Sequence, residues 1–148
     1  DICQEIADSG YCESHIVYAN SDKILKYPSQ FYLIPQDFIS NAGAVASYIA
    51  CFDGHEKIYL LSFDGQAGDN YHNNIYAGTN GYAEEFQHYS DEYWIKSQLM
   101  VMSTYSEVEF VRVCATPNWK CPPEWRALDN FRQISFREFI LEADLGTS

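Results

Sequence analysis

A chain of 148 residues, of which 47% are hydrophobic, can bury a core of its own, which excludes an intrinsically disordered polypeptide. Its formal net charge of −12 at pH 7 opposes binding to nucleic acids and to anionic membranes, because both attract lysine and arginine. The five cysteines contain no CxxC pair, which argues against a disulfide framework or a zinc site and favours a reducing compartment, the cytoplasm. No stretch reaches the roughly 18 apolar residues of a membrane span, so we expect none.

The first 35 residues predict four short elements. A helix is expected over Ile2–Ser9, and the apolar run His15–Ala19 is typical of a strand. Asn20 provides N-cap chemistry for a helix that extends through Leu25 and ends before Pro28. The run Phe31–Ile34 predicts a second strand.

The segment from Asn41 to Gln66 reads as a β-α-β unit. Asn41 caps a helix that runs to about Asp53, and Gly54 is a natural C-terminal stop. The nearly continuous apolar run Lys57–Phe63 predicts a central parallel strand that is buried on both faces.

The later elements continue the alternation of helices and strands. We expect a long helix Asp91–Tyr105, a strand Val108–Val113, a short helix Trp125–Leu128, a strand Phe131–Ser135 and a closing helix Phe136–Asp144. The apolar face of the long helix is expected to comprise Tyr93, Trp94, Ile95, Leu99, Val101 and Met102, and the inward residues of the closing helix Phe136, Phe139, Ile140 and Leu141. This order predicts an α/β fold, a single three-layer Rossmann-like domain over residues 1–148 with a central, mostly parallel sheet. Because the chain begins at Asp1 and not at a methionine, we expect a processed form or a fragment, such as the C-terminal part, of a longer protein.

In an open parallel sheet, ligands bind outside the carboxyl ends of the strands, where the sequence places Asp64. Asp64 has two interpretations: it binds a sugar hydroxyl, or it caps the Asp-Gly turn. A metal site of Asp64, Asp69 and His72 is the weaker hypothesis, and we expect no metal or other cofactor. The following loop is rich in asparagine and tyrosine, and Asn73, Asn74 and Tyr76 supply groups that suit sugars and nucleosides. The alternative is an exposed polar loop.

His88 precedes the long helix. A neutral imidazole there can act as a general base, and the alternative is a surface histidine near a helix N-terminus. The chain contains no glycine-rich phosphate loop, no GxSxG nucleophile elbow and no HExxH motif. These absences disfavour dinucleotide oxidoreductases, P-loop enzymes, α/β-hydrolases and zincins.

The central segment resembles the bacterial lipooligosaccharide sialyltransferases and related polysaccharide-biosynthesis domains. The resemblance covers roughly half of the chain, residues 40–118. It begins with Asn41-Ala-Gly43 at the helix start and continues through Gly54, Lys57-Ile-Tyr-Leu60 and Asp64. It resumes at His88 and the long helix and ends with Thr116-Pro-Asn118.

The resemblance implies a metal-independent transferase that uses a CMP-linked sugar donor and a glycan acceptor in surface polysaccharide synthesis. His88 falls within about one position of the family's catalytic base. Ser40, Asn41 and Gly43 match the turn that contacts the nucleotide-sugar, and Asn118 matches a polar position after the later strand.

Position 66 departs from the family, which has a tyrosine there that stabilises the leaving phosphate, whereas this chain has Gln66. The family also has a nucleotide-binding β-α unit well before this segment, and only forty residues precede Asn41 here. Both departures favour an alternative from another class, a non-catalytic sugar- or nucleotide-binding module. An unrelated flavodoxin-like or Rossmann-like domain without an assigned ligand is the third hypothesis.

Overall fold

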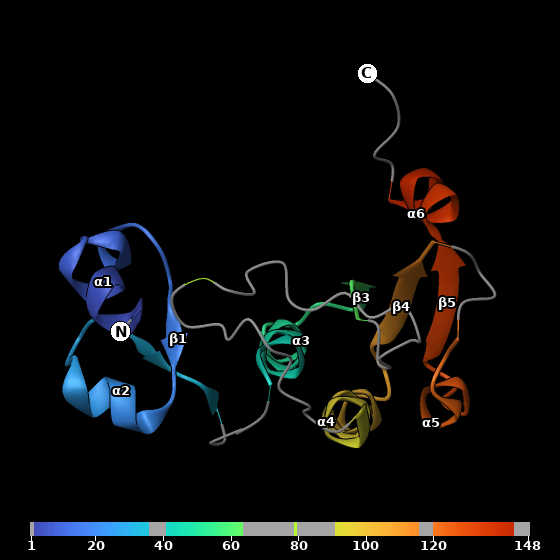
Figure 1. Ribbon diagram of the computed structural model, residues 1–148, viewed down its shortest axis with the longest axis horizontal. Helices are drawn as coiled ribbons and strands as arrows, with labels where there is room; N and C mark the ends of the chain where they lie inside the picture. Colours follow the sequence, from blue (N-terminus) through green and yellow to red (C-terminus); the bar gives the residue numbers. More distant parts are fainter. Residues whose placement is uncertain (1, 36–40, 64–78, 80–90, 116–119, 144–148) are drawn as a thin grey trace. The chain divides into compact units, whose positions relative to one another are not determined.

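A computed structural model of the protein describes residues 2–35, 41–63, 79, 91–115 and 120–143. The chain divides into two compact units, residues 1–40 and residues 41–148. Each unit has strands of its own, and the two units are described separately below (Figure 1).

The first unit is a short β-α-β arrangement with two short helical segments before it. Its two strands pair in parallel, with Tyr18 opposite Tyr32, and the helix between them provides the crossover. Its small core contains Ala19, Tyr27 and Phe31. In chain order the elements are α1 (Ile2–Asp8), η1 (Tyr11–Glu13), β1 (Tyr18–Ala19), α2 (Ser21–Lys26) and β2 (Tyr32–Leu33).

The second unit alternates helices and strands around a three-stranded sheet. The strand order is β3-β4-β5, and both pairs are parallel, which confirms the α/β class and the parallel sheet. Its elements are α3 (Ala42–Phe52), β3 (Lys57–Leu61), α4 (Asp91–Thr104), β4 (Glu109–Cys114), α5 (Pro123–Arg126), β5 (Phe131–Ser135) and α6 (Phe136–Glu142).

The centre of this sheet is β4, and the expectation of a central strand at Lys57–Phe63 is wrong for the described residues. There, β3 pairs only with β4, and Lys57 and Leu61 at its two ends are exposed. Five of the six residues of β4 are buried, because this strand has a neighbour on each side. An apolar run therefore identified a strand but not its position in the sheet.

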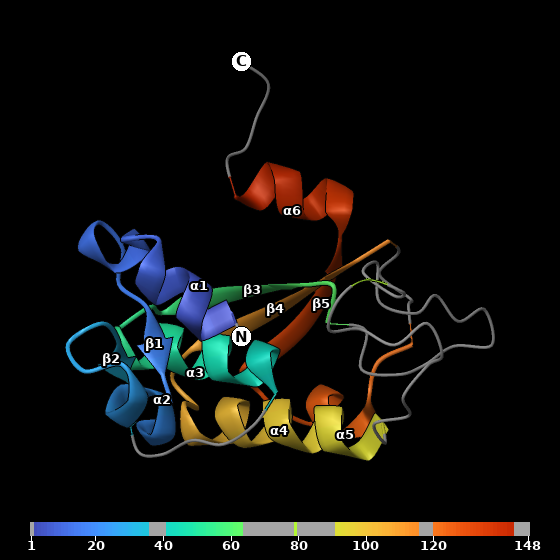
Figure 2. The same ribbon diagram turned by 60° about the vertical axis from the view of Figure 1, so that its left-hand side comes forward.

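Helices cover the two faces of the sheet unequally (Figure 2). Helices α3, α4 and α5 lie on one face, and α6 lies on the other. Side chains alternate along each strand, so Phe110 and Arg112 face the first group of helices while Val111 and Val113 face α6.

The buried faces of two helices differ from the sequence expectation. On α4, Val101 and Met102 are buried as expected, but Ser97 and Gln98 are buried as well, whereas Trp94 remains 41% exposed. On α6, Phe139 packs against the sheet, whereas Phe136, Ile140 and Leu141 are exposed although they were expected to face inward. Within the described part of the chain, no helix is long and apolar enough to cross a membrane.

Candidate functional site

The start of α3 forms one side of the carboxyl edge of the sheet. Asn41 has extended backbone geometry, and its side-chain oxygen accepts a hydrogen bond from the backbone N–H of Ala44 at 3.0 Å. This is an N-cap, and it satisfies one of the N–H groups that a helix start leaves without an intrahelical partner. Of the residues proposed from the sequence to bind the donor, Asn41 and Gly43 are therefore placed at the end of the sheet where ligands bind in this class of fold.

Gly43 lies in the first turn of α3 and touches the end of β3. A Cβ atom at this position would come within 3.1 Å of two ring carbons of Phe63, closer than most side-chain contacts in proteins. The glycine therefore lets the helix start approach the strand end. Ser47, one turn later, donates its hydroxyl hydrogen bond to the Gly43 carbonyl at 3.1 Å.

The chain turns sharply where β3 ends. Ser62 has a φ of 61°, in the left-handed region that residues other than glycine rarely adopt. The turn leads to Phe63, whose carbonyl oxygen accepts a hydrogen bond from Arg112 Nε at 2.8 Å. The end of β3 is therefore held to β4 by the Arg112 side-chain hydrogen bond as well as by the backbone pairing of the sheet.

Arg112 holds the carboxyl edge together. This arginine is 1% exposed, and its Nη1 donates to the Lys120 carbonyl at 2.8 Å and to Gln133 Oε1 at 3.0 Å. The indole ring of Trp125 lies 5.7 Å from the guanidinium carbon, and Trp125 Nε1 donates to the Ile95 carbonyl of α4. One buried guanidinium therefore joins β3, β5, α5 and the segment at Lys120.

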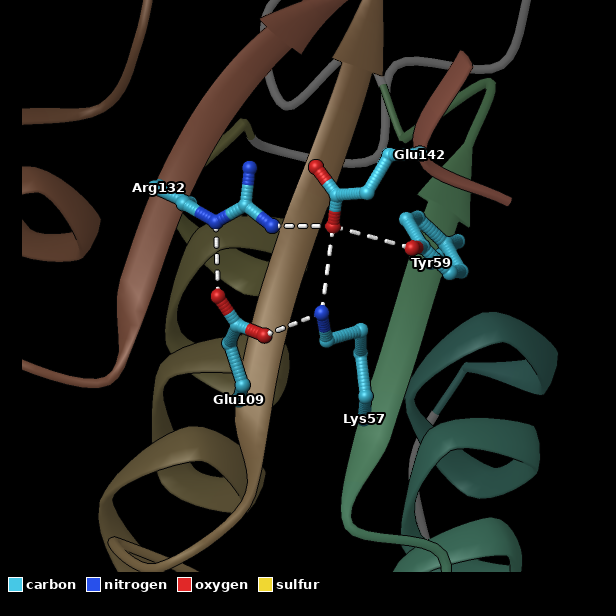
Figure 3. Close-up of polar contacts among 5 residues, drawn as sticks. All are labelled: Lys57, Tyr59, Glu109, Arg132 and Glu142. Carbon is cyan, nitrogen blue, oxygen red and sulfur yellow. Dashed lines mark hydrogen bonds and ion pairs between the residues drawn. The ribbon is translucent and has the colours of Figure 1, made fainter. Parts of the chain in front are cut away.

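A second polar cluster lies on the opposite face of the sheet (Figure 3). Glu142 of α6 accepts hydrogen bonds from Lys57 Nζ at 3.1 Å, from the Tyr59 hydroxyl at 3.0 Å and from Arg132. Glu109 pairs with Lys57 at 2.9 Å and with Arg132 at 2.6 Å. Two cations and two anions alternate, so this network is neutral and fastens α6 to the sheet.

The network also sets the protonation of its members. The Arg132 guanidinium and then Lys57 lower the pKa of Glu142 from 4.5 to about 2, and the same two cations lower the pKa of Glu109. Partial burial, and then the hydrogen bond to Glu142, raises the pKa of Tyr59. The cluster is therefore fully charged at neutral pH and holds no carboxyl group with a raised pKa, which a general acid would need.

Neither the buried Cys51 nor a metal-binding cluster forms a second candidate site among the described residues. Burial, and then the nearby Glu107, raises the pKa of the Cys51 thiol to about 11, so this residue is a core side chain and not a nucleophile. In the described ranges, no group of three histidine, cysteine, aspartate or glutamate side chains lies close enough to hold a metal ion. Asp64, Asp69 and His72 lie outside those ranges.

Most of the residues predicted from the sequence to form the site also lie outside the described residues: Ser40, Asp64, Gln66, Asn73, Asn74, Tyr76, His88 and Asn118. Sequence reasoning missed Arg112, Gln133 and the buried Gln98 of α4. Alternation along the strand Val108–Val113 was the available signal for Arg112, because it places the arginine on the same face as Phe110.

Comparison of the chain with protein-family models, with curated proteins and with solved structures finds no match. The function is therefore argued below from the residues and their geometry.

Proposed function

We propose that this chain is a Rossmann-like glycosyltransferase domain that binds a CMP-linked sugar at the carboxyl edge of its parallel sheet and transfers the sugar to a glycan acceptor. Surface polysaccharide synthesis is the process that the resemblance to sialyltransferases suggests. The observation that carries the proposal is the capped start of α3, where Asn41 and Gly43 lie beside the end of β3.

The chemistry of this edge suits a phosphate group on a protein of net charge −12. The N-terminus of a helix has unpaired N–H groups and a partial positive charge, and both favour a nearby anion. Arg112 adds a full positive charge behind the same edge. The glycine at position 43 lets the end of β3 lie close to this helix start, because a side chain there would meet the Phe63 ring.

The remaining roles follow the resemblance. His88 is the base that deprotonates the acceptor hydroxyl, and Ser40, Asn41, Gly43 and Asp64 shape the donor site. Asn73, Asn74 and Tyr76 contact the sugar from their loop, and Gln66 and Asn118 complete the polar lining. The reaction as proposed requires no metal.

A thermal-shift series tests donor recognition. The purified chain is heated with CMP, UMP, UDP, GDP or AMP, each with and without magnesium. A ligand at 100 times its Kd stabilises the native state by about 2.7 kcal/mol. We expect a selective rise in Tm with CMP that is independent of magnesium, and equal responses to all five nucleotides would contradict the proposed specificity.

A second experiment tests the catalytic step. The variant His88→Ala is expected to abolish transfer from a CMP-linked sugar and to keep the CMP-induced rise in Tm, because the base contacts the acceptor and not the nucleotide. His55→Ala is the matched control, since His55 is an exposed histidine of the described segment. Undiminished turnover in His88→Ala would remove this residue from the mechanism.

Gln66 favours a second candidate function, a non-catalytic module that binds a sugar or nucleotide. The sialyltransferases that the chain resembles have a tyrosine at this position, where it stabilises the leaving phosphate. Binding of CMP without turnover in the wild-type chain would support this candidate, and gain of transfer activity in Gln66→Tyr would identify the missing group.

A further inference from the structure

Helix α4 buries a glutamine whose polar atoms lack partners. Gln98 is 2% exposed, and its Oε1 and Nε2 have no hydrogen-bond partner in the described part of the protein. An amide that loses water on folding and gains no replacement hydrogen bond destabilises the folded state, so most buried amides are paired. Gln98 therefore needs an explanation beyond core packing.

A second orphan amide lies at the start of α3. Asn41 uses its side-chain oxygen for the N-cap, but its Nδ2 is buried and has no partner among the described residues. The side chain as a whole is only half-buried, so this helix start reaches the surface. Together the two residues present one acceptor oxygen and two donor nitrogens.

The packing of the two helices places these amides at the same level. Helices α3 and α4 lie side by side and run in the same direction, since each precedes a strand of the parallel pair β3 and β4 (Figure 2). Tyr48, in the second half of α3, contacts Tyr105, the residue that follows α4, with ring centroids 5.8 Å apart. Asn41 and Gln98 each precede one of these tyrosines by seven residues, about two turns and roughly 10 Å, so helical periodicity predicts that they lie on the same two faces.

Contacts to Arg112 confirm that both helices converge at the carboxyl edge. Helix α3 reaches the guanidinium through Gly43 and Phe63, and α4 reaches it through Ile95 and Trp125. Ile95 is three residues, about one helical turn, before Gln98. The helix N-terminus of α3 and the orphan amide of α4 thus belong to one edge of the sheet.

We infer that Gln98 and Asn41 form an amide subsite that binds a planar group with adjacent hydrogen-bond donors and acceptors. This inference rests on the proposed function and specifies how its donor is recognised. The cytosine base of a CMP-linked sugar has such an edge, with an exocyclic amino group beside acceptor atoms. An N-acyl group on the sugar has the same pairing of N–H and C=O, so the test must distinguish these two sources.

Isothermal titration of the full chain with CMP, N-acetylneuraminic acid and inorganic phosphate is the experiment. Gln98→Met removes the amide and keeps a side chain of similar length, and Asn41→Ser keeps the N-cap oxygen but removes the donor nitrogen. We expect each variant to weaken CMP binding by roughly tenfold and to leave phosphate binding unchanged. Ser97→Ala is the matched control, because the buried Ser97 hydroxyl bonds only to its own helix in the described structure, at the Tyr93 carbonyl.

Protein stability provides a readout that separates binding from folding. Gln98→Met is expected to keep or raise the Tm of the free chain, since it removes unpaired buried polar atoms. The side-chain amide signal of Gln98 in a ¹⁵N spectrum, assigned by its loss in Gln98→Met, is expected to shift when CMP is added.

The possible outcomes separate the subsite from the function. Loss of N-acetylneuraminic acid binding instead of CMP binding would support the subsite with the acyl group as its ligand. If Gln98→Met binds CMP and N-acetylneuraminic acid with wild-type affinity, the subsite is overturned and the proposed function stands. If the wild-type chain binds neither ligand, the subsite and the proposed function are both overturned.

Discussion

Two arginines on neighbouring strands of one sheet have opposite surroundings. Arg112 of β4 faces α3, α4 and α5, is 1% exposed, and donates hydrogen bonds to the Phe63 and Lys120 carbonyls and to the side-chain amide of Gln133. Arg132 of β5 faces α6, has a side chain that is 38% exposed, and pairs with the carboxylates of Glu109 and Glu142.

The difference shows which polar cluster stabilises the packing of α6 and which is a candidate ligand-binding site. On the α6 side, the carboxylates and the cations are paired with one another and exposed to water. A ligand would therefore have to displace ion pairs that already exist. On the α3 and α4 side, a buried cation lies near the edge where parallel sheets bind ligands, and the Asn41 Nδ2 and both side-chain polar atoms of Gln98 are buried without a partner in the described structure. Polar groups buried at a cost to stability are typical of binding sites.

The largest loss of stability is expected for substitution of Arg112, and it tests the difference between the two arginines directly. Arg112→Met would leave the Phe63 and Lys120 carbonyls and Gln133 without their charged donor, and we expect a loss of about 3 kcal/mol in the free energy of unfolding. Arg132→Met is the matched variant on the other face, with an expected loss of at most about 1 kcal/mol because its partners are partly exposed. Urea unfolding at pH 7 measures both, and equal losses would contradict the distinction between the two faces.

A smaller effect concerns the close approach of α3 to β3. Alanine normally stabilises a helix by about 1 kcal/mol relative to glycine. In Gly43→Ala we expect this gain to be cancelled or reversed by the contact of the new methyl group with Phe63. In the background Phe63→Leu the same change is expected to stabilise, so a double-mutant cycle gives a coupling energy of about 1 kcal/mol. Additive effects of the two substitutions would show that the contact does not limit this position.

The smallest effect is the pH dependence of the α6 network. The pKa of Glu142 is lowered from 4.5 to about 2 in the folded protein, so its contribution to stability is fully present above about pH 4.5. As the pH falls from 4.5 towards 2, the carboxylate is protonated and this contribution disappears. Glu142→Gln is therefore expected to be less stable than wild type at pH 7 and to approach it near pH 3.

Denaturant midpoints at pH 7 and pH 3 measure this difference, and 1 M salt at pH 7 is expected to reduce it by screening the exposed charges. A difference that is the same at both pH values would show that the Glu142 charge does not stabilise the packing of α6.

Local sequence signals predicted the elements of this chain well. The strand Phe131–Ser135 is observed as expected, and the long helix ends one residue before its expected limit. Asn41 caps α3, and Gly54 ends it with a φ of 90°. These features depend on hydrogen bonds and backbone angles within a few residues, so the sequence contains the information needed to predict them.

The burial pattern was harder to predict, because it depends on the neighbours of each element. The run Lys57–Phe63 has the composition of a central strand, yet in the described sheet β3 lies at the edge. The apolar residues of α6 give no indication that Phe139 alone of its aromatic and aliphatic side chains would pack with Val111, Val113 and Ile134.

The sequence by itself determined the α/β class, the order of helices and strands, and the helix start that Asn41 caps. Only the tertiary structure showed that Arg112 binds the end of β3 next to this helix start, although Asn41 and Arg112 are 71 positions apart in the chain, and that Gln98 is buried. The physical reason is that hydrogen bonds and helix caps act over a few residues, whereas burial of a charge or an amide depends on the strands and helices packed around it.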